Sequence, residues 1–151
     1  MTCHVYMHDM TIEQDLLRSC ACHKVRMAAR AVTRAYDETL RPTGLRASQL
    51  SVLVAVGTGE APSIAALAQV LGMDRSTLTR NLGPLEKEGL VKGGLEGWRR
   101  SRSLEITKKG QSRLREALPL WQKAQDMLKG RLGNRDWSAA QASMDSLVRV
   151  A

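Results

Sequence analysis

The segment from Ser63 to Gly110 limits the possible folds of this 151-residue chain more than any other part of its sequence. It holds two short helical patterns separated by Gly72, and the second pattern ends at Gly89. Ser63 and Asp74 stand directly before the two patterns, where N-capping residues are preferred. Two short helices joined by a tight turn that contains glycine form a helix-turn-helix, so we expect the chain to be built around that unit.

A β-hairpin is expected directly after the helix-turn-helix. In the sequence LVKGGLEGWRRSRSLEI, from Leu90 to Ile106, two short strand-like runs flank a stretch rich in glycine and arginine. Thr107 then stands at the N-cap of a further helix. This order of elements predicts a mainly α-helical chain of the α+β winged-helix class.

Long amphipathic helices are predicted on both sides of this unit. The sequence from Thr11 to Leu40 contains neither Gly nor Pro, and its apolar residues recur at a spacing of 3.6, which predicts one long helix. A shorter helix is expected over 46–56, and a last one after Gly133. The expected stripe of the helix after Thr107 comprises Leu114, Leu118, Trp121, Gln125 and Leu128.

The composition favours a soluble protein that binds duplex DNA. The formal net charge is +8 and the pI is near 9.9, so the folded surface attracts polyanions, of which nucleic acid is the commonest. Aromatic residues make up only 3%, so a surface that stacks unpaired bases is poorly supplied. No apolar run approaches the roughly 18 residues of a membrane span, and the N-terminus does not resemble a signal peptide. We therefore expect a cytoplasmic protein with no membrane partner.

The outward face of the second short helix carries side chains that suit the DNA major groove. With its leucines facing inward, the polar residues left outward are Arg75, Ser76, Thr77, Thr79, Arg80 and Asn81. Arginine makes bidentate contacts with guanine, asparagine makes them with adenine, and serine and threonine contact phosphates or the thymine methyl group. The alternative is an ordinary solvated helix face. Pro84 removes a backbone donor inside this helix and should bend its second half.

The turn of the predicted hairpin is the second candidate DNA-binding region. Arg99, Arg100 and Arg102 concentrate positive charge there. Such a turn suits the DNA backbone or the minor groove, where the negative potential favours arginine. Ser63, at the start of the first short helix, is also included among the DNA-binding candidates.

Over nearly its whole length the sequence resembles the MarR family of winged-helix regulators. Three segments carry the resemblance: LRASQLSVL at 45–53, SIAALAQVLGMDRSTLTRNLGPLEKEGLV at 63–91, and ITKKG at 106–110. The resemblance implies a homodimeric transcriptional regulator, expected to be a repressor, that binds a palindrome through two recognition helices and is released by an effector. In the family an acidic residue usually stands two positions before the key arginine of the wing, and Trp98 occupies that position here.

The same resemblance divides the chain into two functional parts. We expect a single domain over 1–151, with a winged helix-turn-helix DNA-binding lobe at 46–110. The helices of 11–45 and 111–151 are expected to form the dimerisation lobe.

A thiol is one candidate sensor of the effector. The peroxide-sensing OhrR-like branch of the family has a reactive cysteine in its first helix, and an ungapped match from Tyr36 to Leu45 places Cys22 there. Tyr36 also matches one tyrosine partner of that thiolate, whereas Arg26 and Ala47 occupy the other two tyrosine positions. On one helix, Cys22 and Tyr36 are separated by about 21 Å of rise, so they can meet only across a dimer. The alternative is an inert cysteine in the core.

Other sensing chemistries stay open. Cys20 lies about 200° from Cys22 around the helix, so a disulfide between subunits is favoured over one between these two residues. Cys20 and His23 share a face, but their spacing matches no strong metal motif, and neither a metal nor a cofactor is expected. The expected effector is an organic hydroperoxide or a small aromatic ligand.

Two rival functions fit the residues less well. A thiol enzyme built on Cys22, such as a peroxidase, needs a positioned base, and His23 points about 100° away around the helix. A winged-helix module that binds protein should present an apolar or acidic recognition face, whereas arginine, threonine and asparagine occupy it here. We therefore expect a DNA-binding protein and not an enzyme.

Overall fold

Helices make up most of the described chain in the computed structural model, which comprises residues 12, 14, 16–59, 63–93 and 104–150. The chain divides into two compact units, Met1–Ala35 and Tyr36–Ala151, and the boundary falls inside helix α2 (Ala21–Leu40). No helix of the described residues is both long enough and apolar enough to cross a membrane.

The expected single helix from Thr11 to Leu40 is interrupted at Cys20. Residues 16–19 are helical, Cys20 is not, and α2 begins at Ala21. Helical hydrogen bonds nevertheless flank the irregularity, because the Cys20 N–H donates to the Leu16 carbonyl and the Cys20 carbonyl accepts from the Lys24 N–H, both at 3.0 Å. Side chains around this point are mostly exposed within their unit, so packing does not enforce a regular helix there.

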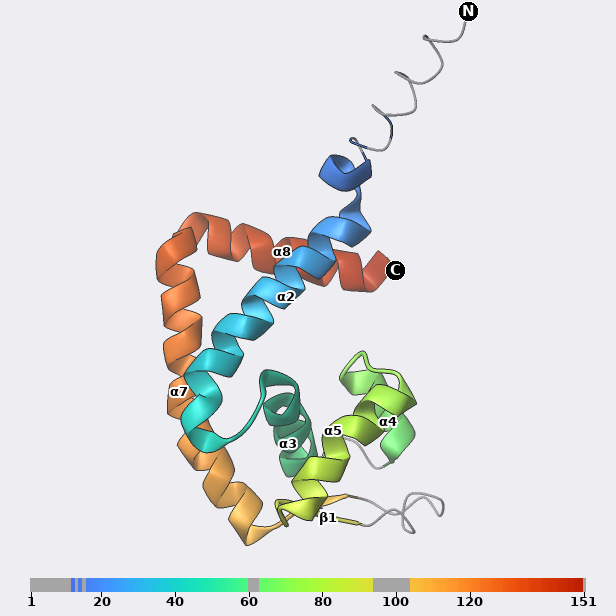
Figure 1. The fold of residues 1–151 in the computed structure, drawn as a ribbon, viewed down its shortest axis with the longest axis vertical. Coiled ribbons are helices and arrows are strands. Elements are labelled where there is room, and N and C mark those ends of the chain that lie inside the picture. The colour runs from blue at the N-terminus through green and yellow to red at the C-terminus, as the bar shows by residue number, and fades with distance from the viewer. Residues whose placement is uncertain (1–11, 13, 15, 60–62, 94–103, 151) are drawn as a thin grey trace, which may run out of the picture. The chain divides into compact units, whose positions relative to one another are not determined.

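The second unit contains the predicted helix-turn-helix and hairpin in the predicted order (Figure 1). Its elements after α2 are η1 (Arg41–Thr43), α3 (Ala47–Thr58), α4 (Ile64–Val70), α5 (Arg75–Lys87), β1 (Val91–Lys92), β2 (Glu105–Ile106), α7 (Lys108–Leu132) and α8 (Asn134–Val150). The two strands pair antiparallel, with Val91 opposite Ile106 and Lys92 opposite Glu105. The winged-helix class predicted from the sequence is confirmed, and α5 is the second helix of the helix-turn-helix, the expected recognition helix.

Leucines of α5 form the centre of the core. Leu78, Leu82 and Leu85 are at most 1% exposed, which confirms the inward stripe predicted for this helix. They pack with α3 and α4, since α5 contacts both helices. Val52 of α3 is also fully buried, because α3 packs against several neighbours, among them α5, α7 and β2. The recognition helix therefore rests on a well-packed base.

Local caps fix where α4, α5 and α7 begin and where α5 ends. The side chains of Ser63, Asp74 and Thr107 accept from the N–H groups of Ala66, Thr77 and Gly110, so all three predicted N-caps are confirmed. Gly89 adopts a φ of 69° after α5, where a left-handed residue ends the helix, and the Leu90 N–H closes the motif on the Leu85 carbonyl at 2.8 Å.

Only part of the stripe predicted for α7 packs within this chain, where Leu114 is partly buried against the core and Gln125 and Leu128 are also partly buried. Leu118 is 44% exposed and Trp121 is 36% exposed, whereas the buried residues of α7 are Gly110, Ala117 and Ala124. The fully buried positions of α7 are thus small residues, which allow neighbouring elements to approach closely. In α8 no residue is buried.

Candidate nucleic-acid interface

The polar face predicted for the recognition helix is accessible. Arg75, Ser76 and Arg80 are exposed, while Thr77, Thr79 and Asn81 are partly buried. Arg75, Ser76, Thr79 and Arg80 line one open surface of α5. Such a face, opposite a fully buried leucine stripe, has the form of a helix that can enter a groove.

Asp74 organises the first turn of this face. Its carboxylate accepts from the Ser76 hydroxyl at 2.5 Å, from the Thr77 N–H at 2.7 Å and from the Thr77 hydroxyl at 2.8 Å. These hydrogen bonds, that from Ser76 foremost, hold the pKa of the Asp74 carboxyl well below its usual range. The carboxylate therefore stays ionised and keeps both hydroxyl side chains in place.

Arg80 is oriented through Thr77. Its Nη2 donates to the Thr77 hydroxyl oxygen at 3.1 Å, and that same hydroxyl donates to Asp74. The Thr79 hydroxyl donates to the Arg75 carbonyl at 2.8 Å. One Arg80 nitrogen is thus held by its own helix, while the remaining guanidinium donors are available for a base edge.

Asn81 has a structural role that the sequence did not reveal. Its Nδ2 donates to the Thr77 carbonyl at 2.9 Å, and its Oδ1 accepts from the Ser48 hydroxyl of α3 at 2.7 Å. Both atoms needed for a bidentate contact with adenine are therefore engaged within the chain. This bond between side chains connects the recognition helix to α3, and no local pattern indicates a pair 33 residues apart.

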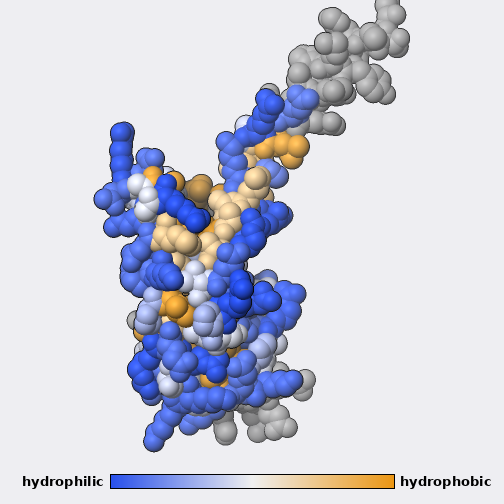
Figure 2. All heavy atoms as spheres, turned by 60° about the vertical axis from the view of Figure 1, so that its left-hand side comes forward, coloured by the Kyte–Doolittle hydropathy of each residue, from blue (hydrophilic) through white to orange (hydrophobic). Residues whose placement is uncertain are grey.

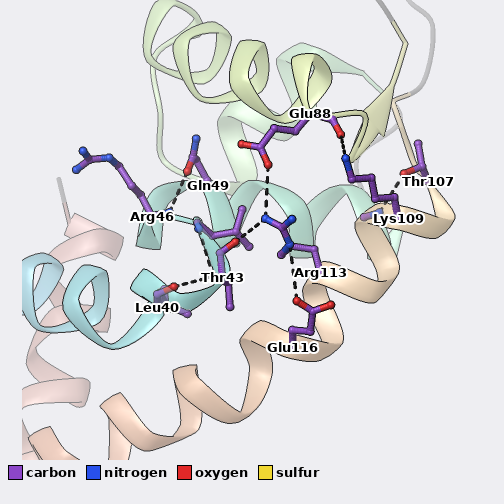
Figure 3. Close-up of polar contacts among 11 residues, drawn as sticks. Leu40, Thr43, Arg46, Gln49, Glu88, Thr107, Lys109, Arg113 and Glu116 are labelled. Atoms are coloured by element: carbon purple, nitrogen blue, oxygen red, sulfur yellow. Dashed lines mark hydrogen bonds and ion pairs between the residues drawn. The ribbon is translucent and has the colours of Figure 1, made fainter.

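The start of α7 binds the end of the recognition helix. The Thr107 hydroxyl donates to the Gly89 carbonyl at 2.7 Å, and Lys109 Nζ donates to the Glu88 carbonyl at 2.7 Å. A Cβ at Gly110 would lie 2.1 Å from the Leu90 carbonyl oxygen, so only glycine allows this approach. Figure 3 shows the contact between Lys109 and Glu88 beside Arg113. Carbonyls at the end of a helix lack partners within it, and α7 supplies them here.

The predicted wing is described only at its base. Its strands are confirmed, and Lys92 Nζ pairs with Glu105 Oε2 across them at 2.7 Å. The candidates Arg99, Arg100 and Arg102, together with Trp98, lie outside the described residues. Ser63 is partly buried and its hydroxyl caps α4, as described above.

The candidate sensing residues have different surroundings. Within the unit Met1–Ala35, Cys22 is exposed and Cys20 is partly buried. The Tyr36 hydroxyl donates to Gln125 Oε1 of α7 at 2.6 Å, and burial raises the pKa of that hydroxyl, so Tyr36 remains a neutral donor. Among the described residues no group of three or more His, Cys, Asp and Glu side chains is arranged to hold a metal ion.

Comparisons with known proteins identify relatives of the whole fold. Residues 43–97 match the model of the MarR family. The transcriptional regulator MosR of M. tuberculosis is 34% identical, with 88% of this chain and 96% of that chain covered and a TM-score of 0.77. Its complex with DNA matches at 36% identity over 85% of this chain and 93% of that chain, with a TM-score of 0.73.

A more distant structure shares the fold alone. CouR from Rhodococcus jostii RHA1, bound to p-coumaroyl-CoA, is 22% identical over 89% of this chain and 96% of that chain, with a TM-score of 0.69. No curated protein sequence matches the chain.

Proposed function

This chain belongs to the MarR family of transcriptional regulators, and we propose that it acts as a homodimeric repressor that binds a palindromic operator and leaves it when Cys22 is oxidised. The DNA-binding lobe then comprises residues 46–110, and the dimerisation lobe comprises residues 11–45 and 111–151. MosR supports the DNA partner, because that relative has been crystallised in complex with DNA.

The observation that carries the proposal is the face of α5. Arg75, Ser76, Thr79 and Arg80 share an open surface, and Arg80 is oriented by the chain of hydrogen bonds from Asp74 through Thr77. A preoriented guanidinium suits bidentate contact with guanine. Since Nδ2 and Oδ1 of Asn81 each already make a hydrogen bond within the chain, we assign Asn81 to holding α5 on α3 and not to base reading.

The remaining candidates take supporting parts in the same complex. Ser76 and Thr79 are proposed to contact phosphates beside the bases that Arg80 reads, and each hydroxyl then turns its hydrogen from its acceptor within the chain to the phosphate. Thr77 is proposed to take part through Arg80, whose guanidinium group it orients. Ser63, which caps α4, is also proposed to contact a phosphate of the backbone. Arg99, Arg100 and Arg102 of the wing are proposed to bind the backbone or the minor groove.

The terminal helices support a homodimer. No residue of α8 is buried, and Leu147 and Val148 are 45% and 82% exposed. Val25 and Met27 of α2 are also at least half exposed. Figure 2 shows hydrophobic surface among the mainly hydrophilic side chains of the molecule. Monomeric soluble proteins rarely leave such apolar surface uncovered, and a second copy of the chain would cover it.

Selection of bound sites from random duplex DNA tests the proposal. The selected sequences should be palindromes with half-site centres about 10 to 10.5 base pairs apart, since two recognition helices then meet the same side of the duplex. A monomer bound to one half-site at nanomolar concentration would contradict the dimer. No enrichment of any sequence would contradict the function as a whole.

Arg80→Ala then tests base reading on the selected duplex. We expect the binding free energy on that duplex to weaken by about 1 to 3 kcal/mol, and the preference for one base to be relaxed at one position. The matched control is Arg115→Ala, which removes the same charge from an exposed position of α7. Equal losses on the selected and the random duplex for Arg80→Ala would show that Arg80 contacts only the backbone.

The effector step follows thiol chemistry. The Cys22 thiol would take one oxygen atom from a hydroperoxide, which leaves as the alcohol, and Cys22 becomes a sulfenic acid. Condensation with a thiol of the second copy would release water and form a disulfide between subunits. The exposure of Cys22 supports this reading over an inert core cysteine.

DNA release by an organic hydroperoxide is the measurement that tests this step. Wild type should dissociate from the operator on oxidation, and Cys22→Ser should stay bound. If both proteins are released to the same extent, Cys22 is not the sensor. If neither is released, the effector is of another class, and a small aromatic ligand becomes the next candidate to titrate.

A further inference from the structure

Arg113 of α7 contacts two other parts of the second unit and a glutamate of its own helix. Its Nη1 donates to the Thr43 carbonyl and lies 3.5 Å from Glu88 Oε2, and its Nε lies 3.8 Å from Glu116 Oε2 (Figure 3). The side chain is only 24% exposed, whereas the Glu116 side chain is 60% exposed. Both glutamate pairs are partly solvated, since the Glu88 side chain is 46% exposed, and the hydrogen bond to the buried Thr43 is the contact best shielded from water.

Glu88 is the C-cap residue of the recognition helix, and α7 holds it at two points. Arg113 pairs with its side chain, and Lys109 Nζ donates to its backbone carbonyl at 2.7 Å. Lys109 and Arg113 are four residues apart, so they project from the same face of α7. The end of α5 is thus bound through both its side chain and its backbone.

Thr43 lies at the junction between α2 and α3. It is 6% exposed, its hydroxyl donates to the Leu40 carbonyl at 2.7 Å, and it accepts from the Leu45 N–H at 3.2 Å. The neighbouring Gly44 has a φ of 72°, and a Cβ placed there would lie 3.6 Å from Arg113 Nη1. The junction is therefore a defined turn in contact with the guanidinium group.

We propose that Arg113 is a positioning residue for sequence recognition: it binds the α2–α3 junction and the end of α5 at the same time, and so sets where the recognition helix lies. This inference rests on the proposed role of α5 in reading DNA. The two N–H groups of Nη1 allow that atom to serve Thr43 and Glu88 together, and Nε donates in a third direction. A lysine ammonium lacks this fixed planar fork, so lysine should replace arginine only in part.

The role predicts a loss of selectivity, not a uniform loss of binding. A displaced recognition helix still has basic groups near phosphates but no longer places Arg80 against its base. For Arg113→Gln we expect affinity for the selected operator to fall about tenfold, as is typical when a hydrogen bond to a charged group is lost. Affinity for random duplex should change by less than about twofold. Arg113→Lys should fall between Arg113→Gln and wild type.

The matched control is Arg115→Gln, which removes the same charge two positions along α7 from an exposed side chain. It should lower both affinities alike and by less than about twofold, since only long-range charge is lost. Each protein is first titrated at stoichiometric DNA to establish its active fraction, and its melting temperature is recorded. Binding is then measured well below that temperature, so that reduced stability by itself cannot alter the ratio of affinities.

Glu88→Gln tests the same link from its other end. It should also reduce operator affinity. In the double variant with Arg113→Gln, the loss of binding free energy should be smaller than the sum of the two single losses. Hydrogen exchange gives a readout without DNA, since the Leu90 amide at the end of α5 should exchange faster in both single variants.

The outcomes separate this inference from the function on which it rests. If wild type shows no preference for any duplex, the proposed function fails. If wild type is selective and Arg113→Gln keeps the same ratio of operator to random affinity, only the positioning role is overturned. The positioning role is also overturned if Arg113→Gln lowers the operator and random affinities equally, or if the losses of Glu88→Gln and Arg113→Gln are fully additive.

Discussion

Helices α5 and α8 differ in what covers their apolar sides. In α5, Leu78, Leu82 and Leu85 are at most 1% exposed, because α3 and α4 pack on them. In α8, Leu147 and Val148 are exposed and nothing is buried. The first helix has its partners within its own unit, whereas the second has large apolar side chains that its own unit leaves exposed.

This difference separates two kinds of stability. The base of the recognition helix should hold at any protein concentration, since its contacts are intramolecular. The side chains of α8 should contribute only once a second copy is present, so their contribution should depend on concentration. The same kind of substitution made in each region therefore tests this difference directly.

The largest effect is expected for Leu82→Ala. Removing a fully buried leucine leaves a cavity, and we expect the free energy of unfolding to fall by about 2 to 5 kcal/mol at every protein concentration. Leu147→Ala should change the unfolding of the monomer by less than about 0.5 kcal/mol but weaken the dimer. Denaturant unfolding at several concentrations, with sedimentation, measures both quantities. A concentration-independent loss for Leu147→Ala would break the comparison.

The next effect concerns two glycines of α7. Gly110→Ala would place a Cβ against the Leu90 carbonyl, so we expect the free energy of unfolding to fall by about 1 to 3 kcal/mol. Nothing lies within 4 Å of a Cβ at Gly130, so Gly130→Ala should stabilise the helix by roughly 0.5 to 1 kcal/mol. Thermal unfolding of the two variants should give opposite signs, and equal signs would show that α7 is not packed as described.

A smaller loss is expected from the cap of α7. Thr107→Ala removes a hydroxyl that accepts from the Gly110 N–H and donates to the Gly89 carbonyl, so the free energy of unfolding should fall by about 1 to 2 kcal/mol. Ser143→Ala removes a hydroxyl of α8 that bonds only to the Ala139 carbonyl, and it should change stability by less than about 0.5 kcal/mol. Urea midpoints compare the two.

The smallest effect is the pH dependence that Asp74 contributes. Because its pKa is lowered in the folded chain, its stabilising effect is complete above the ordinary carboxyl range. The effect declines as the pH falls below that range and disappears below the lowered value. The difference in stability between wild type and Asp74→Asn should therefore be constant near neutral pH and shrink in acid. A difference that grows in acid would contradict the hydrogen bonds described for Asp74.

Local rules explain what the sequence could predict. Each of the N-caps Ser63, Asp74 and Thr107 satisfies a backbone N–H three residues ahead, and the leucine stripe of α5 follows helical spacing. The winged-helix order of elements was predictable for the same reason. The break at Cys20 was not predictable, since neither Gly nor Pro marks it.

Contacts between distant residues explain most of the rest. Asn81 meets Ser48 from 33 positions away, and Arg113 meets Thr43 from 70 positions away. Periodicity has no information about such pairs, which depend on how the helices pack. For that reason Asn81 was predicted as a base-reading residue on its position alone, and Arg113 was not singled out.

The bond from Arg113 to Thr43 also bears on how this reading unit can be moved between proteins. A fragment cut at 46–110 would contain the complete helix-turn-helix yet lack both Thr43 and Arg113, so Glu88 would lose its arginine partner. During synthesis, likewise, the end of the recognition helix gains that partner only after the chain has passed through the hairpin. A transplantable version of this lobe must therefore begin before Thr43 and continue beyond Arg113.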